Sequence, residues 1–242
     1  MKRPPTLQPP PRPALTLPPL DRRDDAEGRV RSEGRALFSS SASTVHFRKG
    51  ETIYRPGDPA DYVYNVATGV VKSYSVHGGQ RLIHWFLFSG DLFGLTYGGR
   101  YTNFTQAITA VTVFRWPTAI LRERLEASPT VHFRVIDKLC DDIRQAQRHA
   151  IIVRRRDATA RLAMVLQFLE EMQALRNNPS HEIYLPMSRT ELGEFAGLSL
   201  ASVSRAFRRL VKAGVIGLRN QRHVKIENRA AFDAFLADDP ER

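Results

Sequence analysis

Cysteine is almost absent from this chain, since Cys140 is the only one in 242 residues. A single thiol cannot form an intramolecular disulfide or supply a multi-cysteine metal cluster. Runs of about 18 apolar residues, the length that a membrane-spanning helix requires, are also missing. The N-terminus is proline-rich and polar where a signal peptide would have an apolar core. We therefore expect a cytoplasmic protein without membrane association or bound metal.

The residue patterns of common catalytic sites are also missing. The chain has no glycine-rich phosphate loop, no Cys/His metal set and no nucleophile elbow. Its serines and histidines show no arrangement that suggests a catalytic triad. The sequence therefore predicts a protein that is not an enzyme and needs no cofactor.

Basic residues exceed acidic residues, most clearly near the C-terminus. The formal net charge is +11, and residues 187–229 hold nine Lys or Arg against three Asp or Glu. Such an excess is typical of proteins that contact nucleic-acid phosphates. Membrane surfaces and RNA also attract basic proteins, so the arrangement of the residues must identify the partner.

Residues 188–212 predict a helix-turn-helix, the motif that places a helix in the DNA major groove. Ser188 precedes Glu191 by three residues, which is the spacing of a capping box at the start of a helix. Gly197 can adopt the positive φ that the turn needs. The first helix would have one apolar face, formed by Leu192, Phe195 and Ala196.

The second helix of this motif would read DNA. Ser199 is placed to cap it, and its apolar face would hold Val203, Phe207 and Leu210. The opposite face has small polar groups first and cations after them, which suits base edges and phosphates respectively. The predicted contacts from the motif are Ser188, Arg189, Ala201, Ser202, Ser204, Arg205, Arg208, Arg209 and Lys212. The alternative is a solvated helix pair in some α-rich domain.

The rest of the segment 157–242 predicts a winged form of this domain. A helix is expected over 159–175, a strand over 183–185, and a hairpin of 215–218 with 223–226. Asn220 lies near the hairpin turn. Arg219 and Arg222 would then reach the DNA backbone.

Residues 31–128 predict an all-β domain. Seven short runs are rich in β-branched and aromatic residues and alternate with glycine-containing turn signals: 45–47, 52–54, 62–66, 70–76, 81–88, 104–110 and 111–116. Strands of this spacing are typical of a sandwich or barrel. Residues 1–30 contain most of the prolines and should be disordered or extended.

A long helix is predicted over 129–156. Its apolar residues are separated by 3, 4, 3, 4 and 3 positions, the a/d pattern of a helix that pairs with another: Ile136, Leu139, Ile143, Ala146, Ala150 and Val153. We expect this stripe to form a homodimer, which suits a palindromic DNA site. The alternative is that it packs against the β-domain alone. Cys140 follows Leu139, and we expect it to be a packing residue, although its oxidation could disturb pairing.

In this order the segments resemble the CRP/FNR family of bacterial transcription regulators over residues 45–228. Four motifs carry the resemblance: FRKGETIYRPGD (47–58), GDLFG (90–94), MSRTELG (187–193) and LSLASVSR (198–205). The stretch 104–117 is closer to the FNR/FixK branch. The resemblance implies an α+β fold with a cyclic-nucleotide-binding-type β-roll, a dimerisation helix and a winged helix-turn-helix. It also implies an activator that contacts RNA polymerase and serves low-oxygen respiration or nitrogen metabolism.

Departures from the family pattern bear on the effector. Leu95 stands where a nucleotide-binding member has glutamate, and Tyr101 or a neighbour stands where it has the phosphate-binding arginine. We therefore expect no response to a cyclic nucleotide. The alternative is a register shifted by one residue, which would place Arg100 at the arginine position. An iron–sulfur cluster needs several cysteines, and this chain has only Cys140, so we expect no cluster. Haem remains as an alternative, with His84 as first candidate among His46, His77, His84, His132 and His149. The other alternative is a structural DNA-binding protein without sequence preference. The β-domain argues against it, because such a protein would not require one.

The recognition helix departs from the family at one position. The family pattern Glu-x-x-Ser-Arg corresponds here to Ala201-Ser-Val-Ser204-Arg205. The resemblance implies that Ser204 and Arg205 contact bases, with Arg205 donating two hydrogen bonds to guanine. Ala201 cannot accept from cytosine as glutamate does, so we expect a half-site that differs in part from the family's TTGAT-like sequence.

Overall fold

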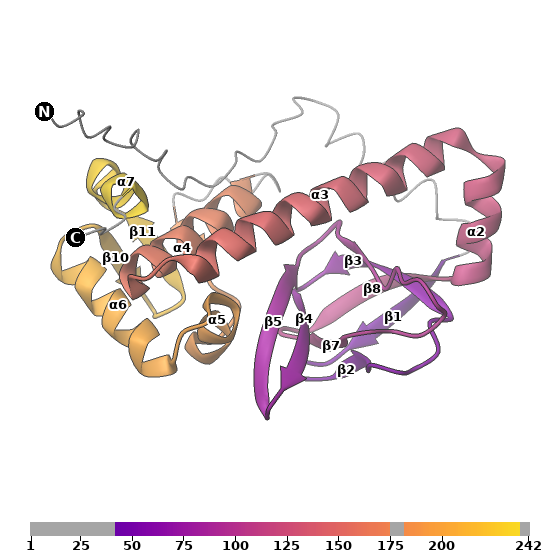
Figure 1. Ribbon diagram of the computed structural model, residues 1–242, viewed down its shortest axis with the longest axis horizontal. Coiled ribbons are helices and arrows are strands. Elements are labelled where there is room, and N and C mark those ends of the chain that lie inside the picture. Colours follow the sequence, from indigo (N-terminus) through magenta and orange to yellow (C-terminus); the bar gives the residue numbers. More distant parts are fainter. Residues whose placement is uncertain (1–41, 175–181, 238–242) are drawn as a thin grey trace, which may run out of the picture.

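The computed structural model describes residues 42–174 and 182–237 of the chain. An N-terminal β-roll, a long helix and a C-terminal helical domain follow one another, with the long helix running from one domain to the other (Figure 1). This arrangement confirms the predicted α+β fold class. The predicted disordered segment 1–30 lies outside the described residues. No helix among the described residues is long and apolar enough to cross a membrane.

The β-roll consists of two four-stranded antiparallel sheets. In spatial order the first contains β1 (Ser43–Phe47), β8 (Val111–Pro117), β3 (Tyr62–Thr68) and β6 (Leu92–Phe93). The second contains β2 (Thr52–Tyr54), β7 (Phe104–Ala107), β4 (Val71–His77) and β5 (Gln80–Leu87). Each of the seven predicted runs contains a strand, although β7 ends three residues before the predicted limit of 110. The two-residue strand β6 was not predicted, because so short a segment has no recognisable alternation.

Two helices follow the β-roll. The short helix α2 (Thr118–Ala127) was not predicted; it buries only Leu121 and so has little amphipathic pattern. The long helix α3 (Pro129–Arg154) begins at Ser128, whose side chain accepts from the Val131 amide, and proline occupies its first turn. It ends where Arg155 adopts an extended conformation, two residues before the predicted limit.

The described part of the C-terminal domain contains four helices and a small sheet. The helices are α4 (Ala158–Ala174), α5 (Arg189–Ala196), α6 (Leu200–Lys212) and α7 (Arg229–Ala237). The antiparallel sheet has the order β10 (Ile216–Arg219), β11 (His223–Ile226) and β9 (Glu182–Tyr184). Asn220 and Gln221 form the hairpin turn between β10 and β11, both at positive φ. The hairpin is the predicted wing, whereas α7 was not predicted.

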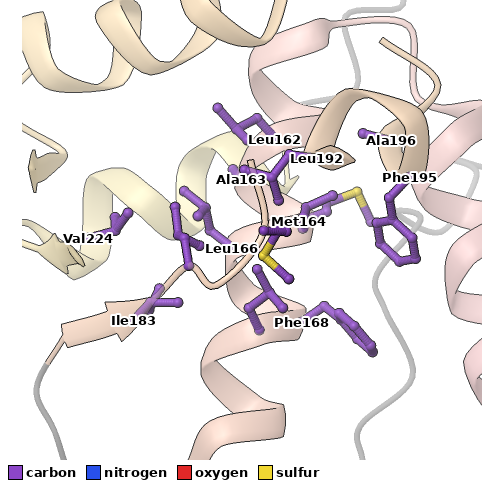
Figure 2. Packing of buried hydrophobic residues seen from close by; sticks show 14 of the residues in the cluster. Leu162, Ala163, Met164, Leu166, Phe168, Ile183, Leu192, Phe195, Ala196 and Val224 are labelled. Atoms are coloured by element: carbon purple, nitrogen blue, oxygen red, sulfur yellow. The ribbon is translucent and has the colours of Figure 1, made fainter. Parts of the chain in front are cut away.

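Helix α4 forms the centre of this domain. Most of its side chains are buried, and they meet α5, β9 and β11 in one apolar cluster (Figure 2). Leu162, Leu166 and Leu169 have no exposed surface. Burying a leucine contributes roughly 1.5–3 kcal/mol, so these contacts fix the two helices of the helix-turn-helix on a rigid support.

Candidate nucleic-acid interface

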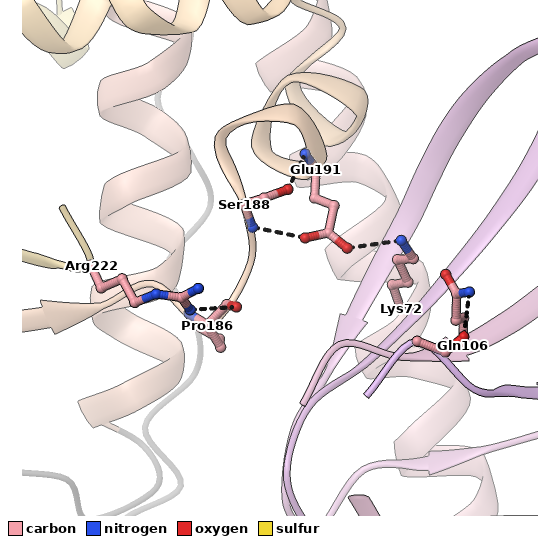
Figure 3. Close-up of polar contacts among 7 residues, drawn as sticks. Lys72, Gln106, Pro186, Ser188, Glu191 and Arg222 are labelled. Atoms are coloured by element: carbon pink, nitrogen blue, oxygen red, sulfur yellow. Dashed lines mark hydrogen bonds and ion pairs between the residues drawn. The ribbon is translucent and has the colours of Figure 1, made fainter. Parts of the chain in front are cut away.

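The first helix of the motif, α5, begins with the predicted capping box. The Ser188 hydroxyl accepts a hydrogen bond from the Glu191 amide at 3.2 Å, and Glu191 Oε2 accepts one from the Ser188 amide at 2.7 Å (Figure 3). Gly197 ends the helix at a φ of 64°. A side chain on Gly197 would be strained there, which explains the glycine at the turn. The Ser188 side chain, a predicted DNA contact, thus also caps the helix.

The recognition helix α6 has one buried and one exposed face. The Ser199 hydroxyl caps it by accepting from the Ser202 amide at 3.1 Å. Its buried face contacts the rest of the domain through Val203, Ala206, Phe207 and Leu210. Because this face is anchored, the opposite face has a defined orientation and is available to a partner.

The exposed face holds most of the predicted DNA contacts. Ala201, Arg205, Arg208 and Lys212 are exposed, and Ser202 and Ser204 are half-buried. Arg205 Nη2 donates to the Ser202 hydroxyl at 3.0 Å, and Arg208 Nε donates to the Ser204 carbonyl at 3.4 Å. Glu191 of the neighbouring helix α5 forms an ion pair with Lys72. Arg205 therefore extends along the helix surface, near its N-terminal end.

The side chain of Arg189, the first residue of α5, lies between the recognition helix and the wing. Its guanidinium carbon lies 3.3 Å from the centre of the Phe207 ring, and Nη2 donates to the Gln221 carbonyl at 3.3 Å. Burial lowers the pKa of Arg189 to about 10, so the side chain remains charged at neutral pH. A cation in this position can meet a phosphate while it ties the wing to the helix-turn-helix.

The other predicted arginines are already bound within the protein. Arg209 pairs with Asp157 at 3.3 Å, and Arg219 forms hydrogen bonds to both carboxylate oxygens of Glu182. Arg222 Nη1 donates to the Pro186 carbonyl at 3.2 Å (Figure 3). Sequence patterns do not reveal these partners. To contact a phosphate, Arg209 would have to leave or share its ion pair with Asp157, and Arg219 its ion pair with Glu182.

The apolar stripe of α3 is exposed. Ile136 and Leu139 are each about half exposed and Ile143 is 60% exposed. Ala146 and Ala150 are also exposed, and Val153 is half-buried. The buried residues of this helix, Val131, Arg148 and Ile152, lie outside the stripe. The stripe therefore does not pack against the β-domain of its own chain, which was the alternative interpretation.

Two further residues extend the exposed surface of α3. Phe133 is 67% exposed, and the a/d spacing did not identify it because it lies one position off the stripe. Cys140 is exposed as well, so it has no packing role within one protomer. An aromatic ring left this open on a helix is typical of an interface residue.

Aromatic side chains fill the interior of the β-roll. Tyr54 and Tyr101 stack with ring centres 3.7 Å apart, and Tyr64 stacks on Phe93 at 5.1 Å. All four are buried, and the Tyr101 hydroxyl donates to the Tyr62 carbonyl at 2.6 Å. Burial raises the pKa of Tyr54 to about 12, so its hydroxyl is neutral at physiological pH.

The candidate effector residues have other partners. Arg100, the nearest candidate for a phosphate ligand, is exposed and donates to the Gly57 carbonyl at 2.6 Å. His84 Nε2 lies 3.0 Å from the Ser75 hydroxyl, and burial, with His149 and His77 nearby, lowers its pKa. Within the described part of the chain, no three His, Cys, Asp or Glu side chains are grouped so as to hold a metal ion.

Comparison with known proteins agrees with this arrangement. A family described as "Cyclic nucleotide-binding domain" matches residues 44–128, and one described as "Crp-like helix-turn-helix domain" matches residues 160–235. The nitrogen fixation regulation protein FixK of Bradyrhizobium diazoefficiens is 32% identical over 183 residues, which are 75% of this chain and 77% of that protein. The fumarate and nitrate reduction regulatory protein of Escherichia coli K12 is 27% identical over 188 residues, 76% of this chain and 75% of that protein.

A solved structure shows the same architecture. FixK2 of Bradyrhizobium japonicum superposes with a TM-score of 0.74 at 32% identity, covering 81% of this chain and 98% of that one. The predicted resemblance, including its FixK-like branch, is therefore confirmed. The chain belongs to the CRP/FNR family of DNA-binding transcription regulators, in its FixK-like branch.

Proposed function

We propose that the protein works as a homodimer that binds a palindromic DNA site through two copies of α6. The observation that carries this proposal is the anchored recognition helix, whose open face presents Ser202, Ser204 and Arg205 to solvent. The exposed stripe on α3 supports the dimer. A two-fold axis along α3 would place the recognition helices about one turn of DNA apart. Selection from random DNA tests this, since a dimer should return inverted repeats.

Base recognition is assigned to the N-terminal half of α6. Arg205 can donate two hydrogen bonds to O6 and N7 of guanine, and Ser204 can contact a neighbouring base. Ser202 holds the Arg205 guanidinium along the helix. The arginine side chain therefore loses less conformational entropy when it binds DNA.

Phosphate contacts are assigned to the cations around this helix. Arg208 and Lys212 are exposed on α6, and Arg189 lies beside the wing. Ser188 and Arg222 flank the start of α5, while Arg209 and Arg219 would contact phosphates only by sharing with Asp157 and Glu182. Neutralising these cations should reduce the salt dependence of binding.

The relatives suggest which genes are regulated. FixK is named for the regulation of nitrogen fixation, and the Escherichia coli relative for fumarate and nitrate reduction. We extend this to the present chain as an activator of low-oxygen respiration or nitrogen-metabolism genes that contacts RNA polymerase in the cytoplasm. Transcript profiling of a deletion strain at low oxygen tests the assignment, because these genes should lose induction.

Replacing Ala201 by glutamate is expected to change the preferred half-site. Glutamate can accept a hydrogen bond from the cytosine N4 amine, whereas the alanine methyl can only contact a thymine methyl. Discrimination at that base pair should shift by about 1–3 kcal/mol. Selection from random DNA with both proteins measures the change. If both return the same half-site, Ala201 lies outside the set of base-reading residues.

Adding cAMP is expected to leave DNA binding unchanged. The interior of the β-roll is occupied by Tyr54, Tyr64, Phe93 and Tyr101, and Arg100 is bound to Gly57 outside it. A charged phosphate buried there would lack the cation that it requires. Calorimetry with cAMP should give no binding heat. A requirement for micromolar cAMP in DNA binding would contradict this prediction. An ultraviolet–visible spectrum of freshly purified protein tests the other effectors, and we expect it to show no haem or iron–sulfur bands.

A further inference from the structure

Lys72 is a buried lysine at the boundary between the two domains. It lies on β4 with 4% of its surface exposed. Its Nζ is 2.8 Å from Oε1 of Glu191, which belongs to the first turn of α5 in the DNA-binding domain (Figure 3). The two residues are 119 positions apart in sequence. A direct ion pair therefore joins the β-roll to the helix-turn-helix.

The surroundings make this contact specific. Burying an ammonium group is costly unless a partner compensates for the lost hydration. Glu191 uses both carboxylate oxygens, one for Lys72 and the other for the Ser188 amide of the capping box. Burial alone would raise the pKa of the Glu191 carboxyl, but hydrogen bonds from Lys72 and Ser188 outweigh it and hold that pKa below its usual value. The carboxylate that starts α5 is thus the counter-ion of a β-roll residue.

Apolar packing around the ion pair joins three segments. Phe195 of α5 lies with its ring centre 5.0 Å from that of Phe86 on β5 and 4.4 Å from that of His149 on α3. His149 Nε2 is also 2.6 Å from the Phe195 carbonyl. Buried residues of β4 and β5 belong to the same apolar cluster as those of α4, α5 and α6. The β-roll, the long helix and the motif meet at this point.

We infer that Lys72 is a positioning residue, through which the β-roll fixes the orientation of the helix-turn-helix relative to α3. The inference rests on the proposed function, because orientation matters when two recognition helices must fit two half-sites at once. The contact involves side chains of the chain itself and so holds the domain in place without a bound effector. It gives the β-roll a structural role in DNA recognition.

The test compares Lys72→Met with Lys49→Met, an exposed lysine of the same β-roll that provides the same charge change. Each protein is titrated with a full palindrome, with palindromes one base pair longer or shorter, and with DNA that keeps a single half-site. We expect Lys72→Met to bind the full palindrome about tenfold more weakly, equivalent to about 1.4 kcal/mol. Binding to the single half-site should change less than about twofold, the additivity error for uncoupled sites. The preference for one spacing should weaken, and Lys49→Met should match the native protein.

A second variant tests whether Lys72 acts through Glu191. Glu191→Gln removes the charge but keeps a side chain that suits a capping box. If the two residues act as a pair, Lys72→Met combined with Glu191→Gln should be no weaker than either single change, whereas additive losses would overturn the inference. An equal loss on the full palindrome and the single half-site would also overturn it.

A third measurement does not depend on DNA or on dimerisation. Amide hydrogen exchange should become faster in β5 and α5 of Lys72→Met and stay unchanged in Lys49→Met, because the contact between the two elements is loosened. Unchanged exchange in Lys72→Met would overturn the inference even if the protein binds palindromes. Conversely, faster exchange in Lys72→Met, together with a native protein that binds no palindrome, would refute the proposed function and leave the positioning role intact.

Discussion

Replacing Ile143 and Ala146 together by glutamate is expected to give a monomer with strongly reduced DNA affinity. Both residues are exposed in the protomer, so the fold should tolerate the change. In a dimer paired along α3, each glutamate would lie near its symmetry mate in a desolvated seam, where like charges are costly. Without the second half-site, affinity for a palindrome should fall about 10²–10⁴-fold, the usual gain from linking two binding events.

Sedimentation equilibrium and DNA titration measure the two effects on the same samples. The matched control is Ala119→Glu with Ala127→Glu, which adds the same charge at exposed positions of α2. The control should remain dimeric and bind DNA close to the native level. A tight dimer in the Ile143 and Ala146 variant would show that the stripe on α3 does not form the interface.

Local signals account for the parts of the site that the sequence predicted. The capping box of α5 was predictable because Ser188 and Glu191 are donor and acceptor for each other across three residues. The buried face of α6 followed from apolar spacing over about two turns. The exposure of the α3 stripe was also implied by its spacing, because an a/d pattern is narrow and leaves the rest of the helix polar. These features depend on chemistry within a few residues of each other.

The remaining features depend on residues that only the fold brings together. Arg209 and Arg219 look like free cations in the sequence, but their partners Asp157 and Glu182 lie 52 and 37 residues away. Lys72 occupies a strand whose alternation gives no sign of a buried ion pair. The aromatic cluster of the β-roll is assembled from four separate segments of the chain. Helix α7 buries only Phe232, so its pattern was too weak to predict.

Contacts within the protomer also divide the basic residues into two groups. Arg205 and Arg208 donate to serines of their own helix, and Lys212 is exposed on the same helix. Arg209 and Arg219 instead pair with the acids Asp157 and Glu182 elsewhere in the domain, and Arg222 donates to the Pro186 carbonyl. The net positive charge therefore overstates the number of cations that are free for DNA. Among Arg205, Arg208 and Lys212, we expect position along the helix to separate base contacts from phosphate contacts, because the N-terminal residues of a recognition helix contact the base edges.

Replacing Arg205 by alanine is expected to abolish the preference for guanine at one position of each half-site. A bidentate contact between arginine and guanine contributes about 1–3 kcal/mol, so a dimer with two such contacts should lose roughly 2–6 kcal/mol on the full palindrome. The helix should be unaffected, since alanine has the highest helix propensity and the exposed side chain donates only to Ser202. Titrations of the selected palindrome, and of the same palindrome with that guanine replaced, measure the loss.

The matched control is Arg208→Ala, about one turn further along the same helix. Arg208 is assigned to a phosphate, so its removal should weaken native and substituted palindromes alike and reduce the salt slope by about 0.9 for each phosphate that is no longer neutralised. Arg205→Ala should instead bind both palindromes equally while the native protein distinguishes them. If Arg205→Ala retains the guanine preference, another residue recognises that base, and the neighbouring Ser204 is the next candidate. A similar loss of discrimination in Arg208→Ala would mean that the boundary between base and phosphate contacts lies further along α6.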